Sequence, residues 1–258
     1  MLRKLISSLL IITIMLFLLS TVVFAEEGYG WFVKRNGNKQ PVFTNEQKSV
    51  SNYSGYYIDS RLNDNSNKKI LYLTFDAGYE NGNVEKILNV LRDENVPAAF
   101  FLLDNIILKN TDLVTRMANE GHLVCNHTKN HKNLTNANEK EITKNLTDLE
   151  KLYEEKTGNT MAKYFRFPEG RYSENALKII QDLGYKTIFW SFAYADWDSN
   201  KQPSNEKAIK KVLQNTHNGA VILLHPTSST NAAILPILIK EWRSMGYTFG
   251  TLDELTSE

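Results

Sequence analysis

Five short stretches of the chain carry polar residues of the kinds that perform acid–base and metal chemistry. The first ends at Asp76, which closes an apolar run that begins at Ile70. The other four each end or follow a strand-like run: "NHTKNH" (126–131), "RFPEG" (166–170), "YADWD" (194–198) and "LLHP" (223–226). In a parallel barrel the carboxyl ends of the strands meet on one face, where the chemistry of such folds takes place. The spacing therefore predicts that the five stretches converge on one site.

Taken singly, these residues leave alternatives open. His127 and His131 are four positions apart, so one helical turn would aim both imidazoles at a divalent metal such as zinc, although two hydrated loop histidines have the same spacing. His225 closes an apolar strand, where a satisfied core histidine is as common as a catalytic one. Arg166 and Asp196 each have the ordinary alternative of half a surface ion pair. Only the set as a whole points to an active site.

The composition sets the class of protein that must position these groups. The chain has 258 residues, of which 42% are hydrophobic and 23% charged, as expected for a globular domain with a sizeable core. The formal charge of +1 and the lack of a basic stripe argue against a nucleic-acid partner. The lack of a carboxylate cluster argues likewise against a metal-dependent nuclease.

From Lys68 onward, strand-like runs alternate with amphipathic helical patterns. The seven runs are "KILYLTF", "AAFFLL", "HLVCN", "KYFRF", "KTIFWSF", "AVILLH" and "YTFGTL". Helical periodicity is clearest around Val84–Leu91, Ile142–Tyr153, Ala176–Leu183 and Ala208–Leu213, and Ser173 and Ser204 are expected N-caps. Such alternation predicts βαβ units, a parallel sheet and a closed or nearly closed α/β barrel.

The N-terminal part of the chain differs from the rest. Residues 1–25 have basic residues, a short apolar core and small residues at the end, which predicts a signal peptide cleaved after Ala25, with an uncleaved anchor as the alternative. Residues 26–67 have no sustained period and predict an irregular lead-in that wraps the domain at 68–258. The single cysteine, Cys125, is expected to be a buried strand residue.

Together the motifs resemble the polysaccharide deacetylases of the NodB-homology type, carbohydrate esterase family 4. The family pattern of T-F-D-D-G, H-[ST]-x-x-H, R-x-P-x-G, an Asp-Trp segment and a late L-H appears here, in order, as "TFDAG", "HTKNH", "RFPEG", "ADW" and "LLH". The resemblance covers the chain from about Ile70 to the end. It implies a distorted (β/α) barrel of the NodB type that hydrolyses N-acetyl groups of polymeric amino sugars.

The resemblance also implies roles for the acid–base residues. Asp76 would be the general base that deprotonates the attacking water, and Arg166 would pair with it and keep it ionised. His225 would be the general acid that protonates the leaving amine. Asp196 would bond the other ring nitrogen of His225 and favour the imidazolium.

Further roles concern metal and substrate. His127 and His131 would hold a divalent cation, zinc by expectation, that polarises the acetyl carbonyl. The oxyanion would meet the metal and a backbone N–H near Tyr172. Trp197 offers a flat face for a sugar ring, with a core tryptophan as the alternative.

One position departs from the family pattern. Ala77 stands where most members have the carboxylate that binds the metal, so the site loses one of three protein ligands. Three consequences are open: weak metal binding through two histidines, catalysis without metal, or a sugar-binding pseudoenzyme. Because Asp76, Arg166, Asp196 and His225 are all present, we expect an enzyme.

"FDAGYENG", "GYYIDS" and "FWSFAYADWD" narrow the resemblance to the δ-lactam-biosynthetic de-N-acetylases of spore-forming bacteria (the PdaA type), in which a non-carboxylate is common at the position of Ala77. That branch implies N-acetylmuramic acid of spore-cortex peptidoglycan as substrate. The free lactyl carboxylate of this sugar calls for a cation, and Arg171 is the candidate, with a solvated surface arginine as the alternative. In "RFPEG", Phe167 and Glu169 depart from the R-P-P-R-G form of the branch.

Three hypotheses follow. The leading one is an exported N-acetylmuramic acid deacetylase acting at the cell wall or the outer face of the membrane, in the spore envelope. A deacetylase of N-acetylglucosamine in peptidoglycan or chitin oligomers would use the same machinery. A non-catalytic wall-binding protein is the alternative of another class. Glycan strands are the expected partner, and no obligate protein partner is indicated.

Overall fold

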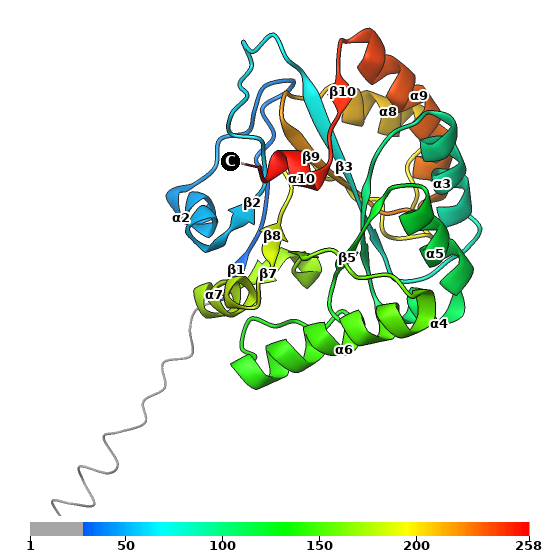
Figure 1. Ribbon diagram of the computed structural model, residues 1–258. Coiled ribbons are helices and arrows are strands. Elements are labelled where there is room, and N and C mark those ends of the chain that lie inside the picture. The colour runs from blue at the N-terminus through cyan, green and yellow to red at the C-terminus, as the bar shows by residue number, and fades with distance from the viewer. Residues whose placement is uncertain (1–27, 258) are drawn as a thin grey trace, which may run out of the picture.

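The computed structural model describes residues 28–257, so the predicted signal peptide lies outside the described residues. Within this range, none of the helices combines the length and apolar character needed to span a membrane. The main feature is a curled eight-stranded sheet with helices packed around it (Figure 1).

The sheet contains all seven strands that the sequence predicts. In the order in which they pair they are β10 (Thr248–Phe249), β3 (Ile70–Ala77), β4 (Ala99–Leu102), β5 (Leu123–Asn126), β6 (Tyr164–Phe165) and β8 (Lys186–Ile188), and β9 (Ala220–Leu224) pairs with β3. The eighth strand, β2 (Gly55–Tyr56), comes from the lead-in and pairs with β8. Every pairing in this sheet is parallel, so the carboxyl ends of the strands lie on one side.

The ring of strands closes irregularly after β8. The predicted strand at 186–192 keeps regular pairing only to Ile188, and Phe192 then forms an isolated parallel bridge with Ile222 of β9. Backbone hydrogen bonds run from Phe192 N–H to Val221 and from Leu223 N–H back to Phe192. This irregular junction joins the last strand of the series to β9 and so to β3, which confirms the distorted α/β barrel.

Helices surround the sheet. They are α2 (Asn45–Ser49), α3 (Val84–Asp93), α4 (Asp104–Lys109), α5 (Thr111–Asn119), α6 (Glu139–Thr157), α7 (Glu174–Asp182), α8 (Asn205–Leu213), α9 (Ser229–Ser244) and α10 (Leu252–Leu255), with short 3₁₀ turns at Val50–Tyr53 and Pro168–Gly170. Two of them differ from the rest, because α2 belongs to the lead-in and α10 packs Leu252 and Leu255 against the inner face of the strands. Both predicted N-caps are confirmed: Ser173 accepts from the N–H of Ala176, and Ser204 from that of Lys207. Such caps satisfy backbone donors that the first helical turn leaves free.

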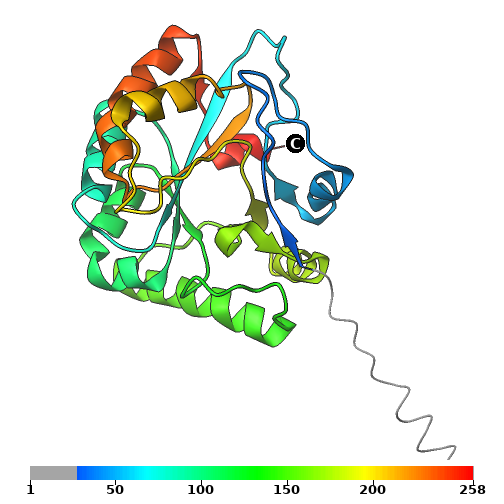
Figure 2. The same ribbon diagram turned by 180° about the vertical axis from the view of Figure 1, so that it is seen from behind.

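The lead-in lies on the side of the molecule opposite α3, α5 and α9 (Figures 1 and 2). Its strand β1 (Tyr29–Gly30) pairs antiparallel with β7 (Arg171–Tyr172), directly after the "RFPEG" stretch. Trp31 and Phe43 of the lead-in belong to the second hydrophobic cluster of the core, with Phe165, Phe167 and Phe189. Residues 28–67 are therefore packed onto the barrel through both backbone pairing and aromatic burial.

Cys125 confirms its prediction: it is a free, buried cysteine on β5. Burial raises the pKa of its thiol well above the ordinary value, because a thiolate would lose hydration there. The residue therefore contributes packing within the sheet and has no nucleophilic character at neutral pH.

Candidate active site

The carboxyl ends of the strands open into one cleft with a volume of about 640 Å³. Five of the residues singled out in the sequence line it: Asp76, His127, His131, Trp197 and His225. They come from different strand ends, and parallel pairing brings them together, as the sequence predicted. Arg166 and Asp196 lie behind this surface, buried and bonded to lining residues.

Asp76 and Arg166 form a buried ion pair at the floor of the cleft. Nη1 of Arg166 donates to Oδ1 of Asp76 at 2.7 Å, and the arginine side chain is 0% exposed. Burial by itself would raise the pKa of Asp76, but the Arg166 guanidinium, followed by His127 and His225, holds it below the usual range. Asp76 is therefore an anion at neutral pH that can accept a proton from a group in the cleft.

Four further contacts hold the Arg166 guanidinium. Nε donates to the carbonyl of Ile188 at 2.9 Å, and Nη2 donates to Oγ1 of Thr74 at 2.9 Å. The guanidinium also lies 4.1 Å from the ring centre of Phe101 and 5.9 Å from that of Trp190, within the range of a cation–π contact. Thr74 was not among the predicted site residues, although it stands in "TFDAG" two positions before Asp76.

The segment from His127 to His131 is a loop, not the helical turn that the spacing suggested. Thr128 and His131 have φ values of 69° and 59°, in the left-handed region. The buried amide of Asn126, which sequence reasoning missed, holds this backbone: Oδ1 accepts from the N–H of Thr128 at 3.0 Å, and Nδ2 donates to the hydroxyl of Tyr185 at 3.1 Å. The loop nevertheless places the two histidine rings 5.0 Å apart, so the predicted proximity is correct although its predicted cause is wrong.

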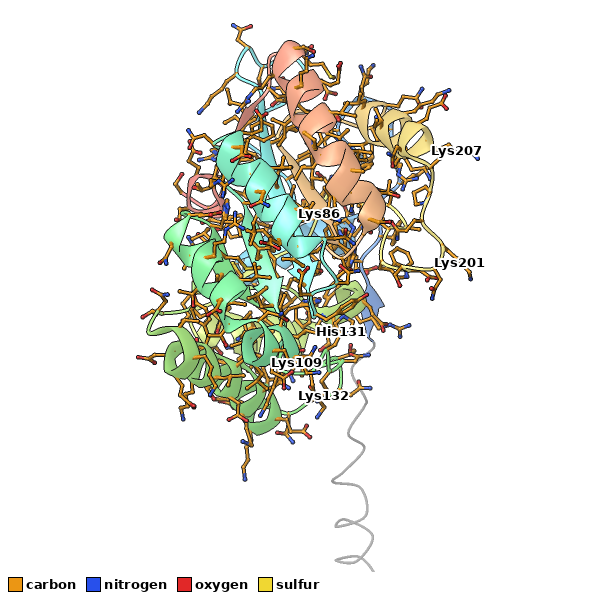
Figure 3. The ribbon with its side chains drawn as sticks, turned by 90° about the vertical axis from the view of Figure 1, so that its right-hand side faces the viewer. Lys86, Lys109, His131, Lys132, Lys201 and Lys207 are labelled. Atoms are coloured by element: carbon orange, nitrogen blue, oxygen red, sulfur yellow. The ribbon has the colours of Figure 1, made fainter. Side chains whose placement is uncertain are left out.

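The two histidines differ as candidate metal ligands. Nδ1 of His127 lies 2.9 Å from the carbonyl of Arg166 and must donate to it, which leaves the lone pair on Nε2. Burial lowers the pKa of His127 to about 4, so the ring is neutral, and its Nε2 lies 3.5 Å from Oδ2 of Asp76. His131 is exposed at the surface of the molecule, where Figure 3 shows it.

The donor set is incomplete for a site with three protein ligands. Ala77 lines the cleft with a methyl group where a carboxylate would be needed. Among residues 28–257, no group of three or more His, Cys, Asp or Glu side chains is placed to hold a metal ion. Because structural and catalytic zinc sites normally use three or four protein ligands, the residues present do not fit such a site.

His225 follows β9, the strand beside β3, and belongs to a chain of hydrogen bonds. Nδ1 donates to Oδ1 of Asp196 at 2.7 Å, and the backbone N–H of His225 donates to Oδ2 at 2.9 Å. Nδ2 of Asn231 donates to the same Oδ2 at 2.6 Å, and the hydroxyl of Tyr194 donates to Oδ1 of Asn231. Asn231 was missed from sequence because no short spacing links the first turn of α9 to "YADWD", whereas Tyr194 stands in that stretch but was given no role.

This chain sets the protonation of His225. Burial alone would lower the pKa of His225, but the hydrogen bond and charge of Asp196, with a further contribution from Asp76, raise it above 6.5. The imidazolium therefore persists to a higher pH than in a free histidine, and Nε2 carries a proton toward the cleft. A base and an acid of complementary protonation state thus line one cleft.

The raised pKa of His225 predicts how any activity that needs its imidazolium depends on pH. Asp196→Asn removes the charge that raises the pKa of His225, so the loss of activity on the alkaline side should begin at a lower pH than in the wild type. The measurement is kcat/KM against pH, with Asp198→Asn, a change in the same loop outside this chain, as the control. An unchanged alkaline limb in Asp196→Asn would contradict the assignment.

The three predicted substrate-binding residues have different positions. Trp197 is 62% exposed and lines the cleft, 6.2 Å from the ring of His225, so it is not a core tryptophan. Arg171 does not line the cleft and pairs with Glu169 at 2.9 Å. Tyr172 is buried in the aromatic cluster and also lies outside the lining. Glu169, with φ of 57°, is the residue of this stretch that reaches the cleft besides Phe167.

Comparison with known proteins agrees with this geometry. The polysaccharide deacetylase family model matches residues 63–188. The chain is 36% identical over 234 residues to the peptidoglycan-N-acetylmuramic acid deacetylase PdaA of Bacillus subtilis, covering 90% of this chain and 87% of that protein. The crystal structure of PdaA, a family 4 carbohydrate esterase, superposes with a TM-score of 0.83 at 34% identity, covering 89% of this chain and 97% of that one.

Two other relatives bear on the alternatives. A peptidoglycan-N-acetylglucosamine deacetylase of Bacillus cereus is 31% identical over 196 residues, which are 74% of this chain and 89% of that protein. A carbohydrate esterase family 4 pseudoenzyme from Bacillus anthracis has a TM-score of 0.68 at 28% identity, covering 74% of this chain and 66% of that one. The similarity to PdaA, over most of both chains, establishes the family. The chain belongs to the polysaccharide deacetylases of carbohydrate esterase family 4, with their NodB-type fold.

Proposed function

We propose that the protein removes the N-acetyl group from N-acetylmuramic acid residues of peptidoglycan. The observation that carries the proposal is that an ionised Asp76 and a His225 of raised pKa line one cleft, at the ends of the neighbouring strands β3 and β9. The similarity to PdaA over 90% of the chain supports this sugar. A role in muramic δ-lactam formation in the spore cortex, and export to the outer face of the membrane or the cell wall, belong to the same proposal.

In the proposed reaction, Asp76 accepts a proton from a water molecule in the cleft while the water oxygen bonds to the acetyl carbon. The carbonyl π electrons move to the oxygen and form a tetrahedral intermediate. His225 then donates the proton on Nε2 to the amide nitrogen as the C–N bond breaks, which yields acetate and a free amine. Arg166 and Asp196 hold the base and the acid in place through bonds of 2.7 Å each. This division of labour is general acid–base catalysis.

Lysine side chains outside the cleft lining offer positive charge for an anionic glycan. Lys86, Lys109, Lys132 and Lys201 lie on the face of the molecule that presents His131 (Figure 3). The ion pairs of Lys132 with Glu141, at 3.5 Å, and of Lys201 with Asp198, at 3.9 Å, are long and leave these ammonium groups accessible. A muramic acid that has lost its peptide carries a lactyl carboxylate, which such a face would attract. We therefore assign the recognition of this carboxylate to the lysine-bearing face, with Arg171 kept as a further candidate.

Family members generally depend on a metal, whereas this chain offers two imidazoles and no carboxylate from position 77. We propose that zinc binds weakly here and that the steps above proceed through the chain's own groups. Ala77→Asp is then expected to tighten zinc binding by at least about tenfold, since even outer-shell groups change metal affinity by about 10- to 100-fold. Competition titration against a chromophoric chelator measures this, with Ala77→Asn as a control of similar size. Equal zinc affinity in the wild type and Ala77→Asp would refute the prediction.

The function is tested with purified protein and cortex-type glycan, with and without prior removal of the stem peptides. Acetate release and muropeptide mass are followed in parallel, with EDTA or zinc added. Acetate released from peptide-free muramic acid supports the proposal. Acetate released from glucosamine residues instead would support the second candidate function, deacetylation of N-acetylglucosamine. The 31% identity to the Bacillus cereus enzyme favours this candidate. No acetate under any metal condition supports a glycan-binding role, as the pseudoenzyme relative illustrates.

A further inference from the structure

The lead-in makes three hydrogen bonds to one wall of the cleft. The backbone N–H of Trp31 donates to the carbonyl of Gly170 at 2.8 Å, and its indole Nε1 donates to the carbonyl of Trp190 at 2.9 Å. Nη2 of Arg35 donates to the carbonyl of Ala193 at 2.8 Å. Trp190 and Ala193 line the cleft, and Gly170 directly follows the lining residue Glu169. A segment far away in sequence thus bonds to the backbone of the wall at three points.

Packing at these points leaves little room for movement. Trp31 is 5% exposed and stacks on Phe189 with a ring separation of 4.3 Å. Gly170 fits between two indoles: a Cβ there would lie 2.9 Å from Cβ of Trp31 and 2.8 Å from Cη2 of Trp190. Contacts this close in a dense interior transmit displacements, so a shift of Trp31 must shift the wall.

The side chains that bond directly to the acid–base groups, by contrast, lie outside the lead-in. Asp76 is bonded by Arg166, which is itself held by Thr74 and Ile188. His225 is bonded by Asp196, and Asp196 by Asn231. All of these residues belong to the predicted domain at 68–258, whereas Trp31 and Arg35 precede even the start of the family match at residue 63. The direct hydrogen bonds of the acid–base groups therefore come from the domain at 68–258, and Phe189 and Trp190 are the points where Arg166 and Trp31 meet.

From these contacts we infer that the lead-in is part of the substrate-binding cleft and that Trp31 and Arg35 are positioning residues for its wall. The cleft would bind the N-acetylated glycan strand of the proposed function. The identity of the sugar rests on that proposed function. In this inference the wall binds the glycan and takes no part in proton transfer. A less firmly held wall should therefore weaken glycan binding and leave the rate of the chemical step unchanged. A segment that only stabilised the fold would not separate the two effects.

The test compares Arg35→Ala and Trp31→Phe, which retains stacking but loses the indole N–H. Loss of one hydrogen bond of ordinary strength is expected to raise KM for the glycan by about threefold or more, with kcat and the pH profile unchanged. Arg61→Ala is the control, because Arg61 is also a lead-in arginine but bonds to the carboxylate of Asp59 and to the carbonyls of Glu254 and Ser257, none of which lines the cleft, so it reports the effect of lost stability alone. Its KM should equal that of the wild type.

Direct binding keeps this inference separate from the proposed function. Dissociation constants for peptide-free glycan oligomers are measured in the Asp76→Asn background, where no turnover interferes. Weaker binding in both lead-in variants supports the inference even if the wild type releases no acetate from muramic acid. Unchanged KM and binding in both folded variants overturns it, as does an equal rise in Arg61→Ala.

Discussion

Asp76→Asn is expected to lower kcat by about 10²- to 10⁴-fold, the range that a positioned general base or acid contributes. The amide can still accept the hydrogen bond from Arg166 but cannot take a proton from water. The variant keeps the size of the side chain at the end of β3 but removes the counter-charge of the buried Arg166, so some stability is lost as well, and circular dichroism checks that it is folded. The rate of acetate release under saturating glycan measures the effect.

Asp59→Asn provides the matched control. Asp59 is also a buried aspartate, 2% exposed, whose carboxylate accepts from Arg61 at 2.9 Å and from the hydroxyl of Tyr72 at 2.6 Å. It does not line the active-site cleft. This variant should lose stability and retain kcat, so a similar loss of kcat in both variants would argue against a catalytic role for Asp76.

Arg166→Met is expected to reduce the free energy of unfolding by about 3–5 kcal/mol, because removing one partner of a buried ion pair leaves the other charge uncompensated. The arginine is fully buried and bonded at once to Asp76, Thr74 and Ile188. Urea denaturation followed by circular dichroism measures the change. Arg166→Lys should recover part of the loss, since it keeps the charge but not the planar fork of donors.

The pH dependence of this stability has a definite sign. The pKa of Asp76 is lower in the folded protein than its ordinary value of 3.8, so its pairing stabilises the fold above about pH 4, and this contribution is lost as pH falls through the folded pKa. The difference between wild type and Arg166→Met should therefore shrink in acid. Arg92→Met, which breaks an exposed ion pair, should leave stability unchanged at every pH. A difference for Arg166→Met that is constant from pH 7 to pH 3 would contradict this account.

The sequence by itself determined the strands, the family and the titratable groups at the strand ends that face the cleft. Period and composition identify seven strands because each buries both faces in a parallel sheet and so reads as an apolar run. Asp76, His127 and His225 could then be recognised because they stand at the carboxyl ends of such runs, and parallel pairing makes those ends neighbours. Ser173 and Ser204 could be predicted as N-caps because an N-cap acts within one turn of its own helix.

Only the tertiary structure decided which groups support the site. Asn231 reaches Asp196 across 35 positions, and Trp31 reaches Trp190 across 159, distances over which local patterns carry no information. The histidine loop is shaped by left-handed backbone held by the buried Asn126, which a spacing of four cannot distinguish from a helical turn. Arg171 lies outside the cleft lining on β7, which pairs with β1, although its ion-pair partner Glu169 lines the cleft. The reactive side chains can thus be predicted from local sequence, whereas packing between distant segments determines the partners that orient them.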